Sequence, residues 1–541
     1  MIIDMRKLLI STILTLAVLS SFSQENEFGK QVKIVSKYKT TLPNASKLVY
    51  KPVIKDTLKV IPTFDYFFKV KPFGSNFNLI ESEYPKYKES EVETLNGGYL
   101  RLGGGNYSHF DGELAYNNIE NKKVNWGFFA NSNSIAGDVD GVNIGFVDQS
   151  VMAYFTKFNR GESYGASVSY GRDLFHFFNV KNDYTDSRER RGDLNVSAIY
   201  NKVLDDDLKC GAKFSYTNFN DSFSSLVENY FELDTYGEVE VLGGNFRANL
   251  NIDYLFSENN FFSVSLNPSY KAKWGLLSVD IGFGLTDLIA EKSKLYIYPK
   301  INISADVFEK YVGVYALIDG GLTYNNYFKS YKINPFVVVA SDEFVEPTYN
   351  EMTLVGGIKG RFDDLFWYNV YCKYSDIEGY NSYILDRDKY SEIMPFMQKS
   401  YDVKLFTFGA EVGVNIDKNL SVVSDFKYYS FDMQSLEKPF NVPDFELSFR
   451  GKYVFDKQLS LGADLIVLGE RDFAKYDEYD IYSKGGTNGI AFDFNASAEY
   501  MFSKYFYVFG KVNNILNQNY ERWESYPSIG INFLAGFTIT F

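Results

Sequence analysis

The stretch NFRANLNIDYLF, Asn245–Phe256, decides the fold. Apolar or small side chains stand at every second position from Phe246 to Tyr254, and polar side chains stand between them. Successive side chains of a β-strand point to opposite faces, so this alternation predicts a strand with one apolar face and one polar face.

The same alternation recurs along the chain from about Gly97, most clearly in FELSFRGKYVF (Phe445–Phe455) and AFDFNASAEYMF (Ala491–Phe502). We identify roughly 21 candidate strands, and a closed bacterial barrel of one chain has an even number. The sequence therefore predicts an all-β fold, a transmembrane antiparallel barrel of about 18–22 strands, with 20 or 22 favoured. Three stretches leave the count open: Leu174–Val180, Ser330–Ala340 and Lys273–Leu288.

Connections between the predicted strands fall into two kinds, as in outer-membrane barrels. Short polar turns are predicted at Asn159–Glu162, Asp205–Asp207, Ser257–Asn260, Phe308–Tyr311, Asp363–Asp364, Asp417–Asn419, Asp456–Gln458 and Ser503–Tyr505. Long polar loops are predicted at Ser375–Ser400 and in NQNYERWESYPSIG near the end. A soluble β-sandwich or propeller is the alternative, but its strands are shorter and its apolar face points inward.

Composition limits the function classes. The chain has 541 residues and a formal net charge of −14, which disfavours a nucleic-acid partner. It contains 44 Tyr and 49 Phe but only 13 Pro, which suits extended strands. Aromatic pairs at strand ends, such as Phe261 and Phe262, suit the girdles at the two membrane interfaces.

The N-terminus has the pattern of a cleavable signal peptide, residues 1–23. Arg6 and Lys7 precede the short apolar run Leu8–Ser20, and Ser21 and Ser23 frame a small-residue cleavage site. An uncleaved anchor helix is the alternative, although the apolar run is shorter than a spanning helix needs. We expect an exported protein of the outer membrane, surrounded by its lipids.

Residues 24–95 differ from the barrel, residues 96–541. Pro52, Pro62 and Pro72 punctuate them, and proline disfavours central strand pairing. We predict an extended leader that faces the periplasm or the lumen.

Catalysis, metals and cofactors find no support in the residue pattern. Ser108, His109 and Asp111 are neighbours, but alternation in a strand would send Ser108 and His109 to opposite faces. Cys210 and Cys372 fall in different predicted strands, and we expect both to be unpaired and buried. We therefore predict no enzyme, no metal and no cofactor.

The best functional candidates are charged residues on the polar faces of the predicted strands, which would face the lumen. Such charges either set the selectivity of a pore or form an ion-pair network that fills a closed lumen. These candidates are Arg247, Asp253, Asp425, Lys427, Glu446, Arg450, Lys452, Asp464, Asp493, Glu499 and Lys511.

The last residues carry a family resemblance. Asn514, Ile515, Leu516, Asn517 and Tyr520 match an N-L-F-N-x-x-Y motif, followed by Pro527, Gly530 and the terminal strand LAGFTITF. This stretch resembles the last two strands of TonB-dependent receptors, whose barrels have 22 strands around a plug. Only residues 24–95 precede the barrel here, so the chain is similar to plugless relatives in Bacteroidota.

The resemblance implies a barrel that passes or binds small solutes at the outer membrane. The open alternative is a scaffold that does not transport and instead docks outer-membrane or periplasmic protein partners of an assembly or secretion complex. The resemblance also implies that Phe537, Ile539 and Phe541 form the signal that the barrel-assembly machinery recognises. An open lumen of this width would make the envelope leaky, so we expect the leader or the long loops to occlude it.

Overall fold

The computed structural model describes residues 97–541, apart from 119–122, 140–141, 178–188, 206–207, 258–259, 291, 309, 339–346, 386–394, 417–418, 434–437, 457 and 477–481. The predicted signal peptide and leader lie outside the described residues. Among these residues, no helix is long and apolar enough to cross a membrane.

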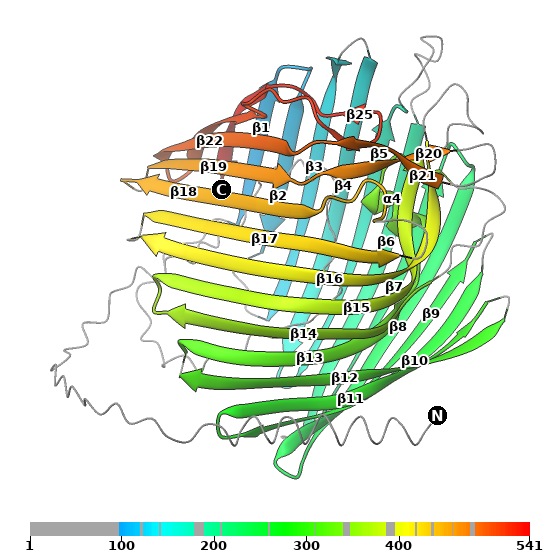
Figure 1. Ribbon diagram of the computed structural model, residues 1–541. Helices are drawn as coiled ribbons and strands as arrows, with labels where there is room; N and C mark the ends of the chain where they lie inside the picture. Colours follow the sequence, from blue (N-terminus) through cyan, green and yellow to red (C-terminus); the bar gives the residue numbers. More distant parts are fainter. Residues whose placement is uncertain are drawn as a thin grey trace, which may run out of the picture. The chain divides into compact units, whose positions relative to one another are not determined.

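Twenty-two antiparallel strands form one closed β-barrel, which confirms the predicted fold and the upper strand number (Figure 1). The first eleven strands are β1 (Gly98–Gly105), β2 (Phe110–Asn117), β3 (Val124–Val139), β4 (Val142–Asn159), β5 (Glu162–Phe175), β6 (Glu189–Asp205), β7 (Leu208–Asp221), β8 (Leu226–Val241), β9 (Gly244–Phe256), β10 (Phe261–Trp274) and β11 (Leu277–Ile289).

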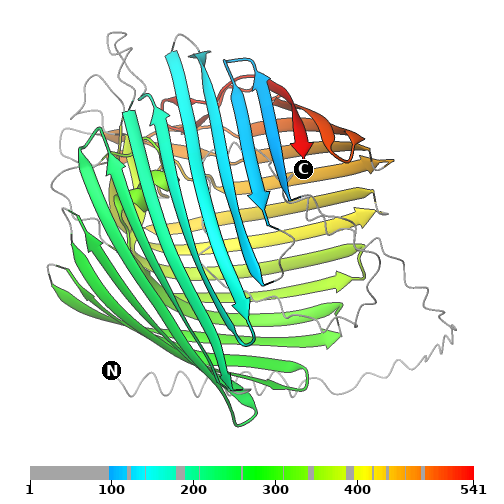
Figure 2. The ribbon, with the colours of Figure 1, turned by 180° about the vertical axis from the view of Figure 1, so that it is seen from behind.

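The other eleven barrel strands are β12 (Ser293–Phe308), β13 (Val312–Thr323), β14 (Thr348–Phe362), β15 (Phe366–Leu385), β16 (Phe396–Ile416), β17 (Leu420–Met433), β18 (Phe445–Phe455), β19 (Leu459–Leu468), β22 (Ala491–Ser503), β23 (Phe506–Asn513) and β26 (Asn532–Thr540). Each pairs with the next along the chain, as Figures 1 and 2 show from opposite sides. Three small elements lie in the connections: α4 (Tyr327–Ile333), the hairpin β20 (Arg471–Tyr476) and β21 (Tyr482–Asn488), and the hairpin β24 (Glu521–Trp523) and β25 (Tyr526–Pro527).

The barrel closes where β26 pairs with β1. Arg101 lies opposite Thr538, and Gly103 lies opposite Gly536. The backbones of Gly98 and Phe541 exchange two hydrogen bonds of 2.9 Å, so the last residue belongs to the closing ladder. A closed barrel leaves no free strand edge, which is why the chain end is paired.

One face of the barrel wall is apolar and the other is polar. On β9, Phe246, Leu250 and Tyr254 are each about two-fifths exposed, although they are large and apolar. The side chains between them are Arg247, Asn249, Asn251 and Asp253. Exposed aromatic residues recur on the same face of β18 and β22, as the sequence alternation predicted. A face of this kind suits contact with lipid.

The connections differ between the two ends of the barrel. All but one of the predicted tight turns lie at the end that contains the chain terminus, which we call the turn end. The exception, Ser257–Asn260, joins β9 to β10 at the other end, the loop end. The turn end instead has two-residue turns at Leu242–Gly243 and Gly275–Leu276, which the sequence did not predict. Leu242, Gly243 and Gly275 have left-handed backbone there, with φ of 53°, 74° and 58°.

Several local predictions were wrong. Most of Ser375–Ser400 is not loop, because β15 and β16 extend to Leu385 and from Phe396. The stretch Ser330–Ala340, which the sequence left open, contributes no barrel strand in its described part, residues 330–338, and contains the end of α4. Ser108 and His109 lie in the turn between β1 and β2 rather than in a strand, and Ser108 has a φ of 48°. The cysteines are unpaired as expected but not buried, since Cys210 is half-buried and Cys372 is exposed.

Candidate functional site

The eleven predicted charged residues all lie on the polar face of the barrel wall. Directly opposite residues in an antiparallel pair share a face. Lys427 pairs with Glu446 and Arg450 with Asp464, so β17, β18 and β19 present these charges together. Nine of the eleven lie on β17, β18, β19, β22 and β23, which we call the charged wall: Asp425, Lys427, Glu446, Arg450, Lys452, Asp464, Asp493, Glu499 and Lys511. Arg247 and Asp253 stand apart on β9.

Most of these charges have polar partners on the same face. Lys427 forms an ion pair of 3.1 Å with Asp425, and Arg247 forms one of 3.6 Å with Glu238. The hydroxyl of Tyr230 donates to the Asp253 carboxylate at 2.7 Å. Both ion pairs are partly exposed, so they add little to stability and remain open to ions or polar solutes.

A second element of the site is a segment that the sequence analysis did not identify. The connection from β13 to β14 begins with residues 324–338, which we call the inner segment. Asn326 caps α4 by accepting the backbone N–H of Lys329 at 2.9 Å, and Pro335 follows the last helical turn. Asparagine is a favoured N-cap and proline cannot continue a helix, so Asn326 and Pro335 explain where this short helix begins and ends.

Strand β8 fixes the start of α4. The carboxylate of Glu228 accepts the backbone N–H groups of Tyr327 and Phe328, each at 3.0 Å. Glu228 is 2 % exposed, so these bonds satisfy a charge that would otherwise be costly to bury. Just before the helix, burial raises the pKa of Tyr324 to about 12, and its hydroxyl hydrogen-bonds to Ser263 on β10.

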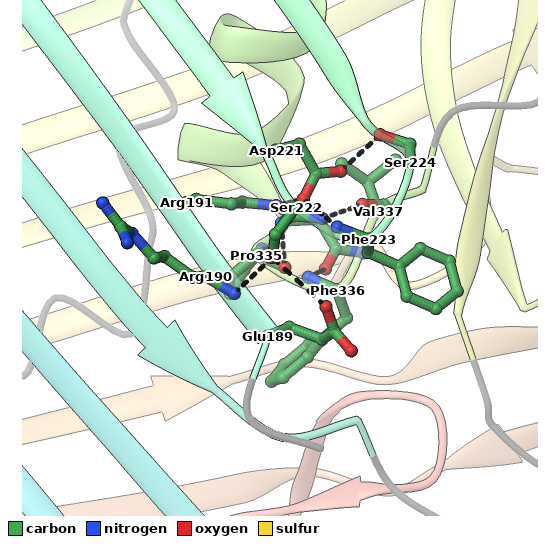
Figure 3. A network of polar contacts seen from close by, with 11 residues as sticks. Glu189, Arg190, Arg191, Asp221, Ser222, Phe223, Ser224, Pro335, Phe336 and Val337 are labelled. Atoms are coloured by element: carbon green, nitrogen blue, oxygen red, sulfur yellow. Dashed lines mark hydrogen bonds and ion pairs between the residues drawn. The ribbon is translucent and has the colours of Figure 1, made fainter.

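Strand β6 fixes the end of the inner segment through Arg191, which is 1 % exposed (Figure 3). Its guanidinium donates to the carbonyl oxygens of Pro335 and Val337, and Nε donates to Asp221 at 3.1 Å. Lys332 of α4 adds an ion pair of 3.3 Å with Asp193 of the same strand. A charged donor on two carbonyls is a strong link, worth about 1.5–3 kcal/mol per hydrogen bond.

The inner segment reaches the opposite wall as well. Backbone hydrogen bonds of 2.9 Å join Phe396, at the start of β16, to Phe336 and Val338. Strand β16 lies far around the ring from β6 and β8, so residues 324–338 cross the inside of the barrel (Figure 1). The polar face, which carries Arg191 and Glu228, is therefore the inner face.

Aromatic packing extends this crossing toward the last loop. The ring of Phe336 stacks on Tyr526 with centroids 3.7 Å apart, and Phe396 lies 5.6 Å from Trp523. On the other side, Tyr331 stacks on Phe219 of β7 at 5.5 Å. We call these residues the aromatic bridge: Phe219, Tyr331, Phe336, Phe396, Trp523 and Tyr526. Five of these six side chains are buried, and full burial of a large apolar side chain contributes about 1.5–3 kcal/mol, so the bridge fixes the inner segment to β7, β16 and the last loop.

The last loop also contacts two of the predicted charged residues on the barrel wall. Arg522 of β24 lies 4.0 Å from Glu446, and Tyr429 donates to the same carboxylate at 3.4 Å. Tyr520 donates to Asp493 at 3.0 Å. Two of the predicted lumen residues thus hold the last loop rather than standing free in the lumen.

The C-terminal motif has a structural explanation. Asn514 and Asn517 have φ values of 47° and 49°, a left-handed conformation that asparagine tolerates. The buried amide of Asn514 donates to the carbonyls of Gln518 and Ile529 at 3.0 and 2.9 Å. Asn517 accepts the backbone N–H of Ile531 at 2.8 Å. The motif therefore folds the last loop back onto the barrel just before β26.

Three solved structures with a similar fold carry the names of receptors or of a transporter. The chain is similar to the ferric enterobactin receptor PfeA from Pseudomonas aeruginosa, with 12% identity, a TM-score of 0.62, and 82% of this chain and 80% of that chain covered. It is similar to the copper transporter OprC, with 11% identity, a TM-score of 0.60, and 83% and 82% covered. It is also similar to the pyoverdine outer membrane receptor FpvA from Pseudomonas aeruginosa PAO1, with 12% identity, a TM-score of 0.63, and 84% and 79% covered.

These likenesses support the barrel fold that the C-terminal motif indicated. No protein-family model matches the chain. No curated protein matches it either. At this level of identity the likeness concerns the fold.

Proposed function

We propose that this protein is an outer-membrane barrel that binds or passes small solutes, in the manner of the receptors it resembles. The observation that carries the proposal is a closed barrel whose inner wall bears mixed charges and is crossed by a tethered segment. Residues 1–23 would direct export, the barrel-assembly machinery would insert the chain, and lipid would cover the apolar face. By analogy with outer-membrane barrels, the turn end faces the periplasm and the loop end faces outward.

In this proposal the charged wall of β17–β23 contacts the solute. A mixed set of cations and anions on a wide wall favours zwitterionic or polar solutes over apolar ones. Arg450 lies opposite Asp464 across β18 and β19, and Lys452, opposite Gly462, is the next residue on the same face of β18, so charges of both signs lie close together on the wall. Neutralising Lys452 or Asp464 would then shift ion selectivity in opposite directions.

The inner segment and the aromatic bridge would close the loop end in the resting state. The leader, residues 24–95, would occlude the turn end, where β1 begins. Both are proposed to move or be displaced when solute passes, because a lumen of this width is otherwise leaky.

A second function is favoured by the closure itself. A barrel sealed by a buried aromatic bridge suits a scaffold that docks outer-membrane or periplasmic proteins without transport. The leader would then be the segment that binds a partner on the periplasmic side.

Planar-bilayer recordings separate the two functions. The full protein would be compared with a variant that lacks residues 24–93, each with and without a change that frees the inner segment. Conductance that either change unmasks, with selectivity altered by Lys452→Gln and Asp464→Asn, supports a solute path. The absence of conductance in all of these proteins, together with a stable protein partner that co-purifies, would favour the scaffold.

The membrane location has a separate test. Unboiled protein is expected to migrate faster than boiled protein on a denaturing gel and to fractionate with the outer membrane. Absence of both behaviours would contradict the location.

A further inference from the structure

Strand β22 rises above its neighbour β23 at the loop end. Its pairing with β23 stops at Ala496, which lies opposite Val512, although β22 begins five residues earlier at Ala491. On the outer face of β23, apolar side chains run only from Phe506 to Val512. Six residue steps of about 3.4 Å, tilted by about 40°, rise roughly 15 Å, whereas the apolar band of a membrane barrel is about 25 Å tall. The outer face of β23 alone is therefore too short for this band.

The last loop fills the gap above β23. The backbone N–H of Ile515 donates to the Phe494 carbonyl at 2.8 Å, on the part of β22 that β23 leaves unpaired. The side chain of Gln518 accepts the Phe492 N–H at 2.5 Å and donates to the Ile490 carbonyl at 3.2 Å. The first residues of the last loop therefore take the place of the missing end of β23.

The start of β26 is capped in the same way. Asn517 accepts the Ile531 N–H at 2.8 Å. Asn106, in the turn between β1 and β2, donates to the Ile531 carbonyl at 3.2 Å and accepts the Phe533 N–H at 2.8 Å. Three amide side chains thus satisfy five backbone groups at the ends of β22 and β26. Water would hydrate such groups, whereas hydrocarbon cannot, so this capping suits a strand end that lies in lipid.

Large apolar side chains stand exposed around these capped strand ends. Leu516 is 55 % exposed, Phe533 53 %, Ile531 45 % and Ile490 43 %. Ile490 precedes the outer-facing Phe492 by two positions, and Ile531 precedes the outer-facing Phe533 by two, so each continues an apolar row of the outer face. We call Ile490, Leu516, Ile531 and Phe533 the apolar rim.

We propose that the apolar rim lies in the hydrocarbon edge of the leaflet at the loop end, in contact with lipid acyl chains. The rim adjoins the apolar rows of β22 and β26, supplies the height that β23 lacks, and surrounds backbone groups that are already capped. The C-terminal motif thus makes a membrane contact, because Asn514 folds the loop while Asn517 and Gln518 make it compatible with lipid. This inference rests on the membrane location proposed above.

Site-directed spin labelling of the full protein in phosphatidylcholine vesicles tests the rim. Oxygen partitions into hydrocarbon and a nickel chelate stays in water, so their separate effects on a nitroxide report its surroundings. The label is placed at Leu516→Cys or Ile531→Cys, in a chain whose two native cysteines are replaced by alanine. Each variant is first shown to be folded by its heat-modifiable mobility on a gel.

Two further positions calibrate the measurement. Phe492→Cys is the reference for the lipid-facing wall, and Ser222→Cys, exposed in the loop-end connection between β7 and β8, is the control for water. We expect the ratio of oxygen to chelate accessibility at Leu516 and Ile531 to match that at Phe492 and to be several-fold higher than that at Ser222.

The possible failures are distinguishable. Labels at Leu516 and Ile531 that behave like Ser222, while Phe492 is in lipid, overturn the rim and leave the membrane location intact. A label at Phe492 that also behaves like Ser222 overturns both. Rim labels shielded from oxygen and from the chelate alike would indicate contact with a protein surface, such as a second copy of the chain, and would overturn the lipid contact.

Discussion

Arg191 on β6 and Val337 in the inner segment are joined by a hydrogen bond of 2.5 Å across 146 positions of sequence. The donor is a wall residue and the acceptor is a backbone carbonyl inside the barrel. Because Asp221 orients the same guanidinium from β7, the wall and the inner segment form one buried polar unit. This unit fixes the inner segment to the barrel wall.

Replacing Arg191 by Gln is expected to release the inner segment. The change removes the donors for Pro335 and Val337 and leaves the buried Asp221 without its cation, at a cost of roughly 3–5 kcal/mol. The barrel itself is held by its strand ladder and should persist. Bilayer recordings are expected to show more frequent openings, and limited proteolysis should cut between β13 and β14.

The neighbouring arginine supplies the control for this prediction. Arg190 is exposed and its side chain points away from the network in Figure 3. Arg190→Gln should leave both conductance and proteolysis unchanged. Equal behaviour of the two variants would show that Arg191 does not hold the inner segment.

Glycine at the closing seam is expected to be indispensable. A Cβ at Gly536 would lie 2.0 Å from the backbone carbonyl oxygen of Leu102, which cannot move without shifting β1. Gly510, opposite Ala535 on the adjacent β23, has no atom within 4 Å of the place where its Cβ would lie. Gly536→Ala should destabilise the barrel by about 1–3 kcal/mol through overpacking, whereas Gly510→Ala should be neutral or better. The stability of each variant is measured as the temperature at which the fast-migrating folded band disappears from a denaturing gel. An equal loss of stability in the two variants would refute the steric argument.

The asparagine that folds the last loop is expected to be important for stability. Asn514→Ala loses the side-chain hydrogen bonds to Gln518 and Ile529 and places alanine at a left-handed φ, at a combined cost of about 3 kcal/mol. Asn514→Gly keeps the backbone conformation and loses only the hydrogen bonds. Its melting temperature should therefore fall between those of the natural protein and the Asn514→Ala variant. A glycine variant as unstable as the alanine variant would assign the whole effect to the side chain.

Removal of the terminal Phe541 is expected to impair assembly more than solute specificity. The deletion takes away both backbone hydrogen bonds to Gly98 and an exposed aromatic ring at the end of the chain. The amount of heat-modifiable protein in the outer-membrane fraction measures the effect. Phe502→Ala, which removes an exposed ring from β22, is the control and should assemble normally. Normal assembly of the deletion variant would contradict a role for Phe541 in the assembly signal.

The sequence by itself determined the wall of this protein. The alternation in Asn245–Phe256 and in the similar stretches depends only on the two-residue period of a strand. The apolar and polar faces of each strand can therefore be predicted from its own residues. The even strand number follows from antiparallel closure, and the pairing of LAGFTITF with β1 follows from the need to remove a free edge. The sequence could place the eleven charged residues on the polar face of their strands, because that prediction needs only the two-residue alternation within each strand.

The tertiary structure alone decided what lies inside the wall. Asn326 and Pro335 mark the ends of α4, but a helix this short gives too weak a periodic signal to reveal it. Its position depends on Glu228 and Arg191, about 100 and 144 residues away from their partners, and no local pattern encodes such distances. For the same reason, only the folded chain shows that Glu446 and Asp493 contact the last loop. Strand faces are set by neighbours in sequence, whereas closure is set by residues that become neighbours when the barrel forms.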